Sequence, residues 1–187
     1  MPRLVAFLRG MNVGGHRLPM TSLRGYFEAL KFKKVETFIA SGNVIFDAPA
    51  GDFTALEGRI EKYLARELGY AAPTFVRTLP GVASVVAHRA FPKTTAEDSL
   101  YVYFLKTAPD AALKKSVAEL ESDVDKFGLH GRELYWRCRG KISEVSTAWP
   151  GLEKLMRSAV ATSRNVTMLR KLLAQYGEIL AVEEQVR

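Results

Sequence analysis

The sequence predicts an α+β protein made of two ferredoxin-like (βαββαβ-type) halves in tandem, with antiparallel sheets and helices packed on them. Two observations support this fold class. Residues 3–78 show the order strand, helix, strand, strand, helix, strand, and residues 99–160 repeat strand, helix, hairpin, helix without an obvious closing strand. We therefore divide the chain into an N-terminal half, 1–88, and a C-terminal half, 89–187, which carries an added C-terminal helix.

The strands of the first half follow from apolar runs and turn residues. Residues 3–8 are almost continuously apolar, which predicts a central strand buried on both faces. Two β-rich runs, 35–40 and 43–47, are separated by Ser41-Gly42, which predicts a hairpin with a two-residue turn. A closing strand is expected over 73–78.

The helices of the first half follow from apolar spacing. A helix is expected over 21–31. A second is expected over 52–68, where leucine or isoleucine recurs every four residues and forms a buried stripe. Gly69 is expected to end this helix. The stripe consists of Leu56, Ile60, Leu64 and Leu68.

The second half begins with a short helix over 80–88 and a polar stretch, 89–98, which contains Pro92 and is the best linker candidate. The remaining elements are less regular. They are a strand over 100–105, a helix over 110–120, a hairpin of 124–129 with 133–137, a helical stretch after Pro150 and a last helix over 166–176.

The composition of the 187 residues is that of an ordinary globular protein with a basic balance. Lys and Arg number 27 against 20 Asp and Glu, a net charge of +7. Such a balance fits phosphates or nucleic acid as partners, or a basic protein with no anionic partner. The single cysteine allows no internal disulfide and fits a reducing compartment. Because no signal-peptide core or membrane-length apolar run is present, we expect a cytoplasmic protein with no membrane partner.

A glycine-rich loop over 8–17 is the best candidate for a site, because it joins the first strand to the first helix. Its ligand-binding candidates are Arg9, Asn12, Gly14 and Gly15. The loop matches neither the dinucleotide-binding fingerprint nor the phosphate-binding P-loop. Its backbone amides can still form an anion-binding nest. The alternative is a loop that only needs unusual backbone angles.

Two further segments carry candidate ligand residues. Asn43 flanks the tight turn after Ser41, where turn formation is the simpler role. Arg164, Asn165 and Thr167 open the last helix, with Asn165 as a good N-cap. A cation at Arg164 beside the positive helix end does not help stability. An anionic ligand at that end would explain it; otherwise Arg164 faces solvent or pairs with a carboxylate elsewhere.

Other reactive residue types form no recognisable site. The three histidines show no metal-ligand spacing, and no metal site is expected. Cys138 lies between Arg137 and Arg139, which would lower its pKa if it were exposed. Its position at the end of an expected strand favours burial and a structural role. No pair of carboxylates stands out as an acid–base couple.

Three segments resemble the signature of a known bacterial family, domain-of-unknown-function family 1697 (DUF1697). They are Leu8 to Gly15, Ser41 to Phe46 and Arg164 to Thr167. The resemblance implies an intracellular protein with two ferredoxin-like halves, and it brings no established activity, catalytic residue or cofactor. The family usually has isoleucine where this chain has Met11.

Three hypotheses about function remain open, and none decides whether the protein is an enzyme or what its oligomeric state is. The first is a small anionic or phosphorylated ligand. Arg9 and Arg164 would neutralise its charge, the amides of Gly14 and Gly15 would donate hydrogen bonds, and Asn12 and Asn43 would orient it. This first hypothesis requires the glycine-rich loop and the start of the last helix to lie close together in space. The second is nucleic-acid binding through the aromatic run 100–104, although the RNP1 motif is absent. The third is a structural or interaction module without a small ligand.

The sequence also makes a prediction about stability at the start of the last helix. If Arg164 is a ligand contact beside the helix start, replacing it with Ala is expected to leave the free energy of unfolding of the ligand-free protein unchanged or to raise it by at most about 0.3–1 kcal/mol, because a cation opposes the helix dipole. Replacing Asn165 with Ala removes an N-cap and is expected to cost about 0.5–2 kcal/mol.

Overall fold

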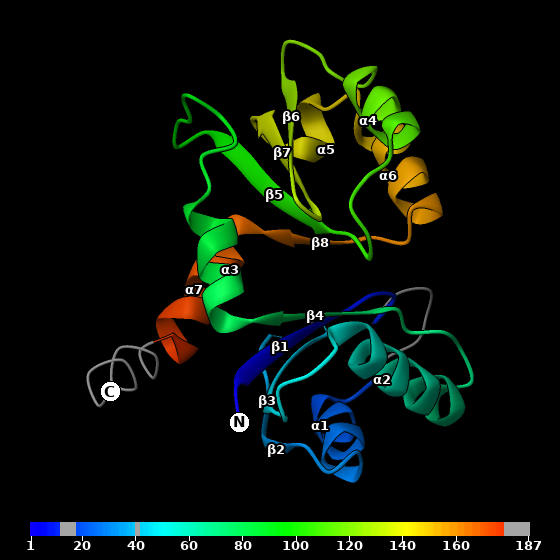
Figure 1. Ribbon diagram of the computed structural model, residues 1–187. Helices are drawn as coiled ribbons and strands as arrows, with labels where there is room; N and C mark the ends of the chain where they lie inside the picture. The colour runs from blue at the N-terminus through cyan, green and yellow to red at the C-terminus, as the bar shows by residue number, and fades with distance from the viewer. Residues whose placement is uncertain (12–17, 40–41, 178–187) are drawn as a thin grey trace. The chain divides into compact units, whose positions relative to one another are not determined.

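The computed structural model describes residues 1–11, 18–39 and 42–177. Within these ranges the protein is α+β, with two four-stranded antiparallel sheets and seven helices (Figure 1). The predicted class, with antiparallel sheets and helices, is confirmed. The chain divides into two compact units: the first comprises Met1–Val82 and the described chain end from Tyr176, and the second comprises Ala83–Gln175.

The first unit contains one sheet and the two helices that follow its first and third strands. The sheet order is β2-β3-β1-β4, and every pairing is antiparallel. Leu4 to Phe7 in the central strand are completely buried, which confirms the predicted burial on both faces. The elements are β1 (Arg3–Leu8), α1 (Met20–Ala29), β2 (Lys33–Thr37), β3 (Asn43–Asp47), α2 (Phe53–Leu68) and β4 (Thr74–Thr78).

Helix α2 begins and ends where its sequence predicts. The Asp52 carboxylate accepts the Thr54 N–H at 2.8 Å, which caps one of the free backbone donors at the helix start. Gly69 adopts φ = 75°, a left-handed conformation that glycine tolerates, and ends the helix. Ile60 and Leu64 are fully buried in the core of the first unit, so the predicted apolar stripe is confirmed.

Two carboxylates of α2 satisfy the backbone of the edge strand β4. Glu57 Oε1 accepts the Val76 N–H, and Glu61 Oε1 accepts the Thr74 N–H, both at 2.7 Å. An edge strand otherwise presents unpaired N–H groups that can pair with another chain. The two glutamates therefore fix α2 against β4 and protect this edge of the sheet.

The connection between β2 and β3 is longer than the predicted two-residue turn, and that prediction is wrong. β2 ends at Thr37, and five residues, 38–42, precede β3; residues 40 and 41 lie outside the described chain. Phe38 N–H donates to the Asn43 carbonyl at 3.0 Å and closes the loop. Gly42 has φ = 72°, and a Cβ there would lie 2.7 Å from Met11 Cγ, so the position requires glycine.

The second unit contains the other sheet, in the order β6-β7-β5-β8. Helices α4 and α6 cover one of its faces, around Tyr103, Leu134 and Trp136 (Figure 1). The elements are the end of α3 (Leu79–Ala87), then β5 (Asp98–Phe104), α4 (Ala111–Ala118), β6 (Asp125–His130), β7 (Glu133–Arg139), α5 (Ile142–Val145), α6 (Trp149–Ser158), β8 (Thr162–Asn165) and α7 (Val166–Tyr176).

Strand β8 closes the second sheet and was not expected. It pairs antiparallel with β5, where Val102 lies opposite Arg164. The four residues Thr162 to Asn165 are polar and carry no apolar alternation, so the sequence has no strand signal there. No helix in the part of the chain that the structure describes is long and apolar enough to span a membrane.

Candidate functional site

The residues predicted to form a site at the glycine-rich loop are only partly described. Arg9 directly follows β1, and its backbone N–H donates to the Pro73 carbonyl at 2.8 Å. Its side chain is half-buried. Asn12, Gly14 and Gly15 lie outside the described residues. A ligand role for this loop therefore stays a prediction.

Asn43 is fully buried at the start of β3. Its side-chain amide donates to the Phe38 carbonyl at 2.9 Å, across the β2–β3 loop. Because Phe38 N–H also donates to the Asn43 carbonyl, the two residues close this loop through both backbone and side chain. These bonds give Asn43 a structural role, and its contact with a ligand stays a prediction.

Asn165 caps the last helix as predicted. Its side-chain oxygen accepts the Thr167 N–H at 2.7 Å, which satisfies a free donor at the start of α7. Replacing Asn165 with Ala should lower the free energy of unfolding by about 0.5–2 kcal/mol, because this donor loses its partner. Chemical denaturation measures the loss. Asn165→Asp, which keeps an acceptor at the same place, should retain most of the stability.

Arg164 lies in strand β8 and is buried, with 7% of its surface exposed. Its Nη1 donates to Thr162 Oγ1 at 2.9 Å and to the Ser163 carbonyl at 2.7 Å. Burial lowers the pKa of Arg164 to about 9, and the guanidinium is still cationic at neutral pH. Arg164 therefore does not face solvent, which was one of the alternatives to an anion contact, and its contact with a ligand stays a prediction.

The predicted site residues fall in both units. Arg9 and Asn43 belong to the first unit, whereas Arg164, Asn165 and Thr167 belong to the second. Within the second unit, the three residues adjoin at the junction of β8 and α7. The convergence of the two groups on one ligand stays a prediction.

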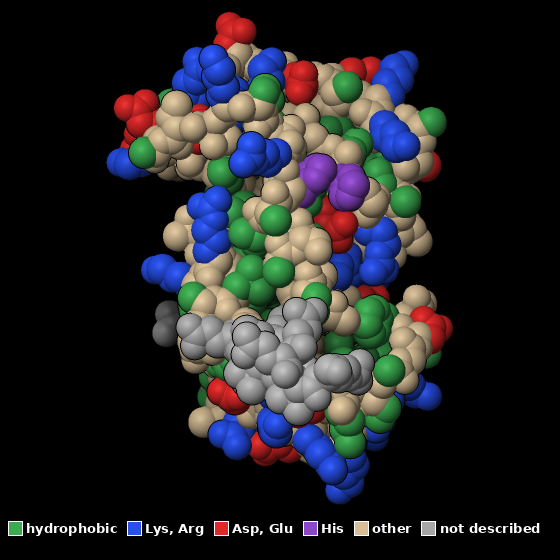
Figure 2. Space-filling view, turned by 60° about the vertical axis from the view of Figure 1, so that its left-hand side comes forward, with side chains coloured by type: hydrophobic (Ala, Val, Ile, Leu, Met, Phe, Trp, Pro, Cys, Tyr) green, Lys and Arg blue, Asp and Glu red, His purple; other side chains and the backbone are tan. Residues whose placement is uncertain are grey.

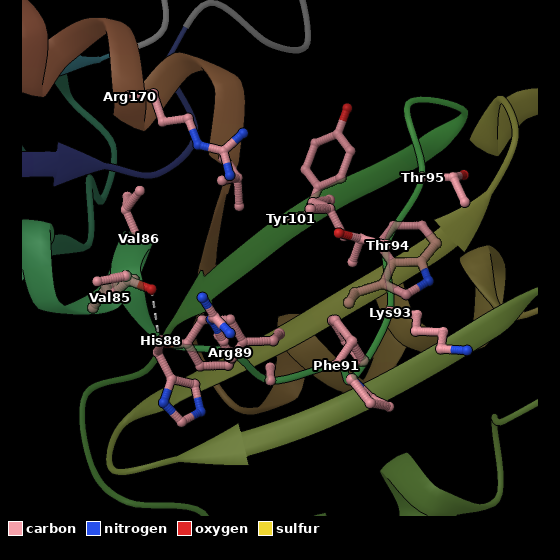
Figure 3. Close-up of a pocket in the computed structure, with 17 residues that line it drawn as sticks. Val85, Val86, His88, Arg89, Phe91, Lys93, Thr94, Thr95, Tyr101 and Arg170 are labelled. Atoms are coloured by element: carbon pink, nitrogen blue, oxygen red, sulfur yellow. Dashed lines mark hydrogen bonds between the residues drawn. The ribbon is translucent and has the colours of Figure 1, made fainter.

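The second unit contains a cavity of about 670 Å³ that the sequence did not predict; we call it the cationic pocket (Figure 3). The end of α3, the chain that follows it, the first turns of α7 and residues of β5 and β7 line it. Its charged lining residues are Arg89, Lys93 and Arg170, and it has no Asp or Glu in its lining. His88 lines it as well. A volume of this size lies in the usual range for sites that bind small molecules.

Residues 88–95, which we call the strap, form the outer wall of the cationic pocket. The strap crosses the sheet at Gly128, where a Cβ would lie only 3.1 Å from Ala90 Cβ. Arg137 of β7 also contacts the strap. Its guanidinium carbon lies 5.8 Å from the centre of the Phe91 ring, and its Nη1 donates to the Lys93 carbonyl at 3.4 Å. The expected linker is therefore packed on the sheet.

Several aromatic side chains lie in or beside the pocket. Tyr135 donates its hydroxyl hydrogen to the Val85 carbonyl at 3.3 Å, which joins β7 to α3. His88 stacks on His130 with ring centres 4.3 Å apart, and the pair lies at the surface in Figure 2. Tyr101 also lines the cavity, but its ring packs with the core under α4 and α6. Its hydroxyl points away from the strap in Figure 3.

The arrangement of charges in the cationic pocket favours an anion. Arg170 reaches in from α7, and Arg89 and Lys93 lie on the strap (Figure 3). Guanidinium and ammonium groups donate charge-assisted hydrogen bonds to phosphate or carboxylate, and these bonds are stronger than neutral ones. All three side chains are exposed and can turn toward a ligand. Phe91, half-buried on the strap between Arg89 and Lys93, offers an apolar surface (Figure 3).

Other candidates for reactive chemistry are structural. Cys138 is buried, and burial together with nearby Asp125 raises the pKa of its thiol to about 11, so it is no nucleophile at neutral pH. This agrees with the structural role that the sequence favoured. Among the residues that the structure describes, no group of three or more His, Cys, Asp or Glu side chains could hold a metal ion.

Comparison with protein families gives one match, which covers residues 1–135 and is described as "Protein of unknown function (DUF1697)". The chain belongs to this family. The family resemblance that the sequence carried is thereby confirmed. No curated protein matches this DUF1697 chain at a significant level.

A solved structure is similar to this DUF1697 protein over most of its length. It is the conserved bacterial protein SP0830 from Streptococcus pneumoniae, at 21% sequence identity and a TM-score of 0.75. The match covers 91% of this chain and 96% of that chain. At this identity the likeness shows a shared fold, and neither comparison indicates a specific function.

Proposed function

We propose that this DUF1697 protein binds a small anionic ligand, such as a phosphorylated metabolite, and that the cationic pocket holds it. The observation that supports the proposal is a cavity of about 670 Å³ whose charged lining residues, Arg89, Lys93 and Arg170, are all basic. Anionic groups of the ligand would contact these three side chains, and Phe91 would contact its apolar part.

We extend the proposal to the fold type and to the cellular compartment. The strand order β2-β3-β1-β4 and its counterpart β6-β7-β5-β8, each with a helix after the first and third strands, support two ferredoxin-like halves. A boundary near residue 88 would separate them. A single buried cysteine and a phosphorylated ligand both fit the cytoplasm.

The glycine-rich loop, with Arg9, Asn12, Gly14 and Gly15, is the alternative location for the same ligand. It and the cationic pocket predict different residues in contact with the anion, so one experiment can separate them. For nucleic-acid binding, the second hypothesis, Val102 and Tyr103 are buried and offer no exposed surface for base stacking. The net charge alone supports it, and the salt dependence of binding would reveal it.

The experiment is a thermal-shift and calorimetric titration with phosphate, pyrophosphate, ribose 5-phosphate and AMP at fixed ionic strength. A ligand that binds only the native protein raises its melting temperature. We expect at least one of these probes to do so. The double variant Lys93→Ala/Arg170→Ala should weaken its binding by at least about tenfold, because each charge-assisted bond contributes about 1.5–3 kcal/mol.

The control for this double variant is Lys154→Ala, which removes an exposed cation from α6, outside the pocket lining. It should bind the probe like the wild type. The double variant itself should melt within about 1 °C of the wild type without ligand, because surface substitutions change stability little. The proposal is wrong if no probe raises the melting temperature, or if the double variant binds as tightly as the wild type.

A further inference from the structure

We propose that a second cavity in the same unit, on the side of the sheet that α4 and α6 cover, binds a neutral sugar ring. We call it the Trp149 cavity. Its volume is about 680 Å³, and it opens between β5 and the α5–α6 segment. Its lining includes Ser99, Tyr101, Lys141, Ser143, Ser146 and Trp149. This site goes beyond the anionic ligand proposed above and shares only Tyr101 with the cationic pocket.

Trp149 is exposed and yet held in place. The exposed fraction of this residue is 41%, one of the few large apolar side chains at the surface of the described chain. Its backbone N–H donates to Ser146 Oγ at 3.1 Å. Its ring centre lies 5.6 Å from that of Trp136, which is fully buried. An aromatic ring that is fixed before binding loses little entropy when a ligand packs on it.

A buried carboxylate fixes the segment of chain that carries Trp149. Asp125, which is completely buried, accepts hydrogen bonds from Trp136 Nε1–H at 2.9 Å, from the Ser146 hydroxyl at 3.0 Å and from the Ala148 N–H at 3.3 Å. Burying a carboxylate is costly unless such bonds satisfy it. The bonds join β6 and β7 to the segment 146–149, so they fix the part of the chain that presents Trp149.

The lining of the cavity selects the class of ligand. The lining contains no carboxylate, and its one cation is Lys141. Lys141 Nζ lies 3.1 Å from Glu144 Oε1. Because this ion pair balances the charge of the lysine, an uncharged ligand fits the cavity. The serine hydroxyls and Tyr101 can exchange hydrogen bonds with hydroxyl groups; Ser99, for example, donates to the Gly140 carbonyl at 2.8 Å and can still accept. A pyranose ring offers both an apolar C–H face for Trp149 and hydroxyls around its rim. A purely aromatic ligand would make no use of the remaining acceptor capacity of these hydroxyls.

Tryptophan fluorescence tests this inference directly, because the chain has only two tryptophans and Trp136 is buried. The probes are methyl α-glucoside, methyl β-glucoside, methyl β-galactoside and maltose, each titrated to millimolar concentration, with phenol as the aromatic comparison. We expect a saturable change in emission with at least one sugar. Calorimetry should then show about tenfold weaker binding for Trp149→Ala and less weakening for Trp149→Tyr, which keeps a ring.

Two matched variants keep the result interpretable. Lys93→Ala, in the cationic pocket, should bind the sugar like the wild type, and so should Lys154→Ala. The inference is overturned if no sugar produces a saturable change, if only phenol does, or if Trp149→Ala binds as tightly as the wild type. Because these probes carry no charge, their failure leaves the anion proposal standing, and failure of the anion probes leaves this one standing.

Discussion

Replacing Asp125 with Ala is expected to lower the free energy of unfolding by about 3–5 kcal/mol, the largest effect expected of any single substitution considered. The change removes a completely buried acceptor from Trp136 Nε1–H, the Ser146 hydroxyl and the Ala148 N–H. Each buried donor without a partner costs about 1–3 kcal/mol, and the relief of burying a charge offsets part of the sum. Urea denaturation, followed by fluorescence, measures the loss.

The matched control is Asp123→Ala, an exposed aspartate two residues away, which should cost less than about 0.5 kcal/mol. Asp125→Asn should fall between the two, because its amide oxygen can still accept the Trp136 and Ser146 hydrogen bonds that reach Oδ1, whereas its NH₂ group cannot accept the one from the Ala148 N–H. If Asp125→Ala were no less stable than Asp123→Ala, the carboxylate would not hold the 146–149 segment, and the structural basis for fixing Trp149 would fail.

Replacing Arg164 with Ala is expected to cost about 2–4 kcal/mol, because it removes a large, almost completely buried side chain from β8. The sequence predicted little or no loss, on the premise of a cation at an open helix end. The burial of Arg164 removes that premise. Chemical denaturation of Arg164→Ala beside Asn165→Ala decides between the two expectations, and Arg164→Ala should now be the less stable variant.

Arg164→Met separates packing from charge. Methionine retains much of the apolar stem and removes the guanidinium, so this variant should lose less stability than Arg164→Ala. Its hydrogen bonds to Thr162 Oγ1 and the Ser163 carbonyl are lost in both variants. An Arg164→Ala protein as stable as the wild type would contradict the burial of this side chain and would restore the premise of a cation beside the start of the last helix.

The parts of the fold that the sequence predicted are those with strong local signals. The continuous apolar run of β1 and the four-residue spacing on α2 were sufficient to predict these two elements. A strand buried on both faces and a helix buried along one stripe leave distinct patterns of apolar residues. Asn165 was identified as a cap from its residue type and position, and its bond to Thr167 confirms this. Strand β8 was missed because Thr162 to Asn165 is short and polar, and only its pairing with β5 makes it a strand.

The cationic pocket could not be predicted from the sequence, since it depends on contacts between distant segments. Arg89 and Lys93 lie in a polar stretch that has the composition of a linker, and Arg170 is one of several exposed cations on helices. What makes this stretch a pocket wall is its close approach to Gly128 and its contacts with Arg137. A glycine inside a strand pattern was the one available signal, because it often marks a close backbone approach.

An NMR titration of the ¹⁵N-labelled protein with pyrophosphate shows directly whether an anion binds in the cationic pocket. Backbone amides and arginine Nε–Hε groups are followed together, so both candidate locations are observed in one experiment. We expect the largest shifts on the strap, residues 88–95, and on the first turns of α7 around Arg170. Shifts confined to the glycine-rich loop, residues 8–17, with the strap and Arg170 unchanged, would contradict it.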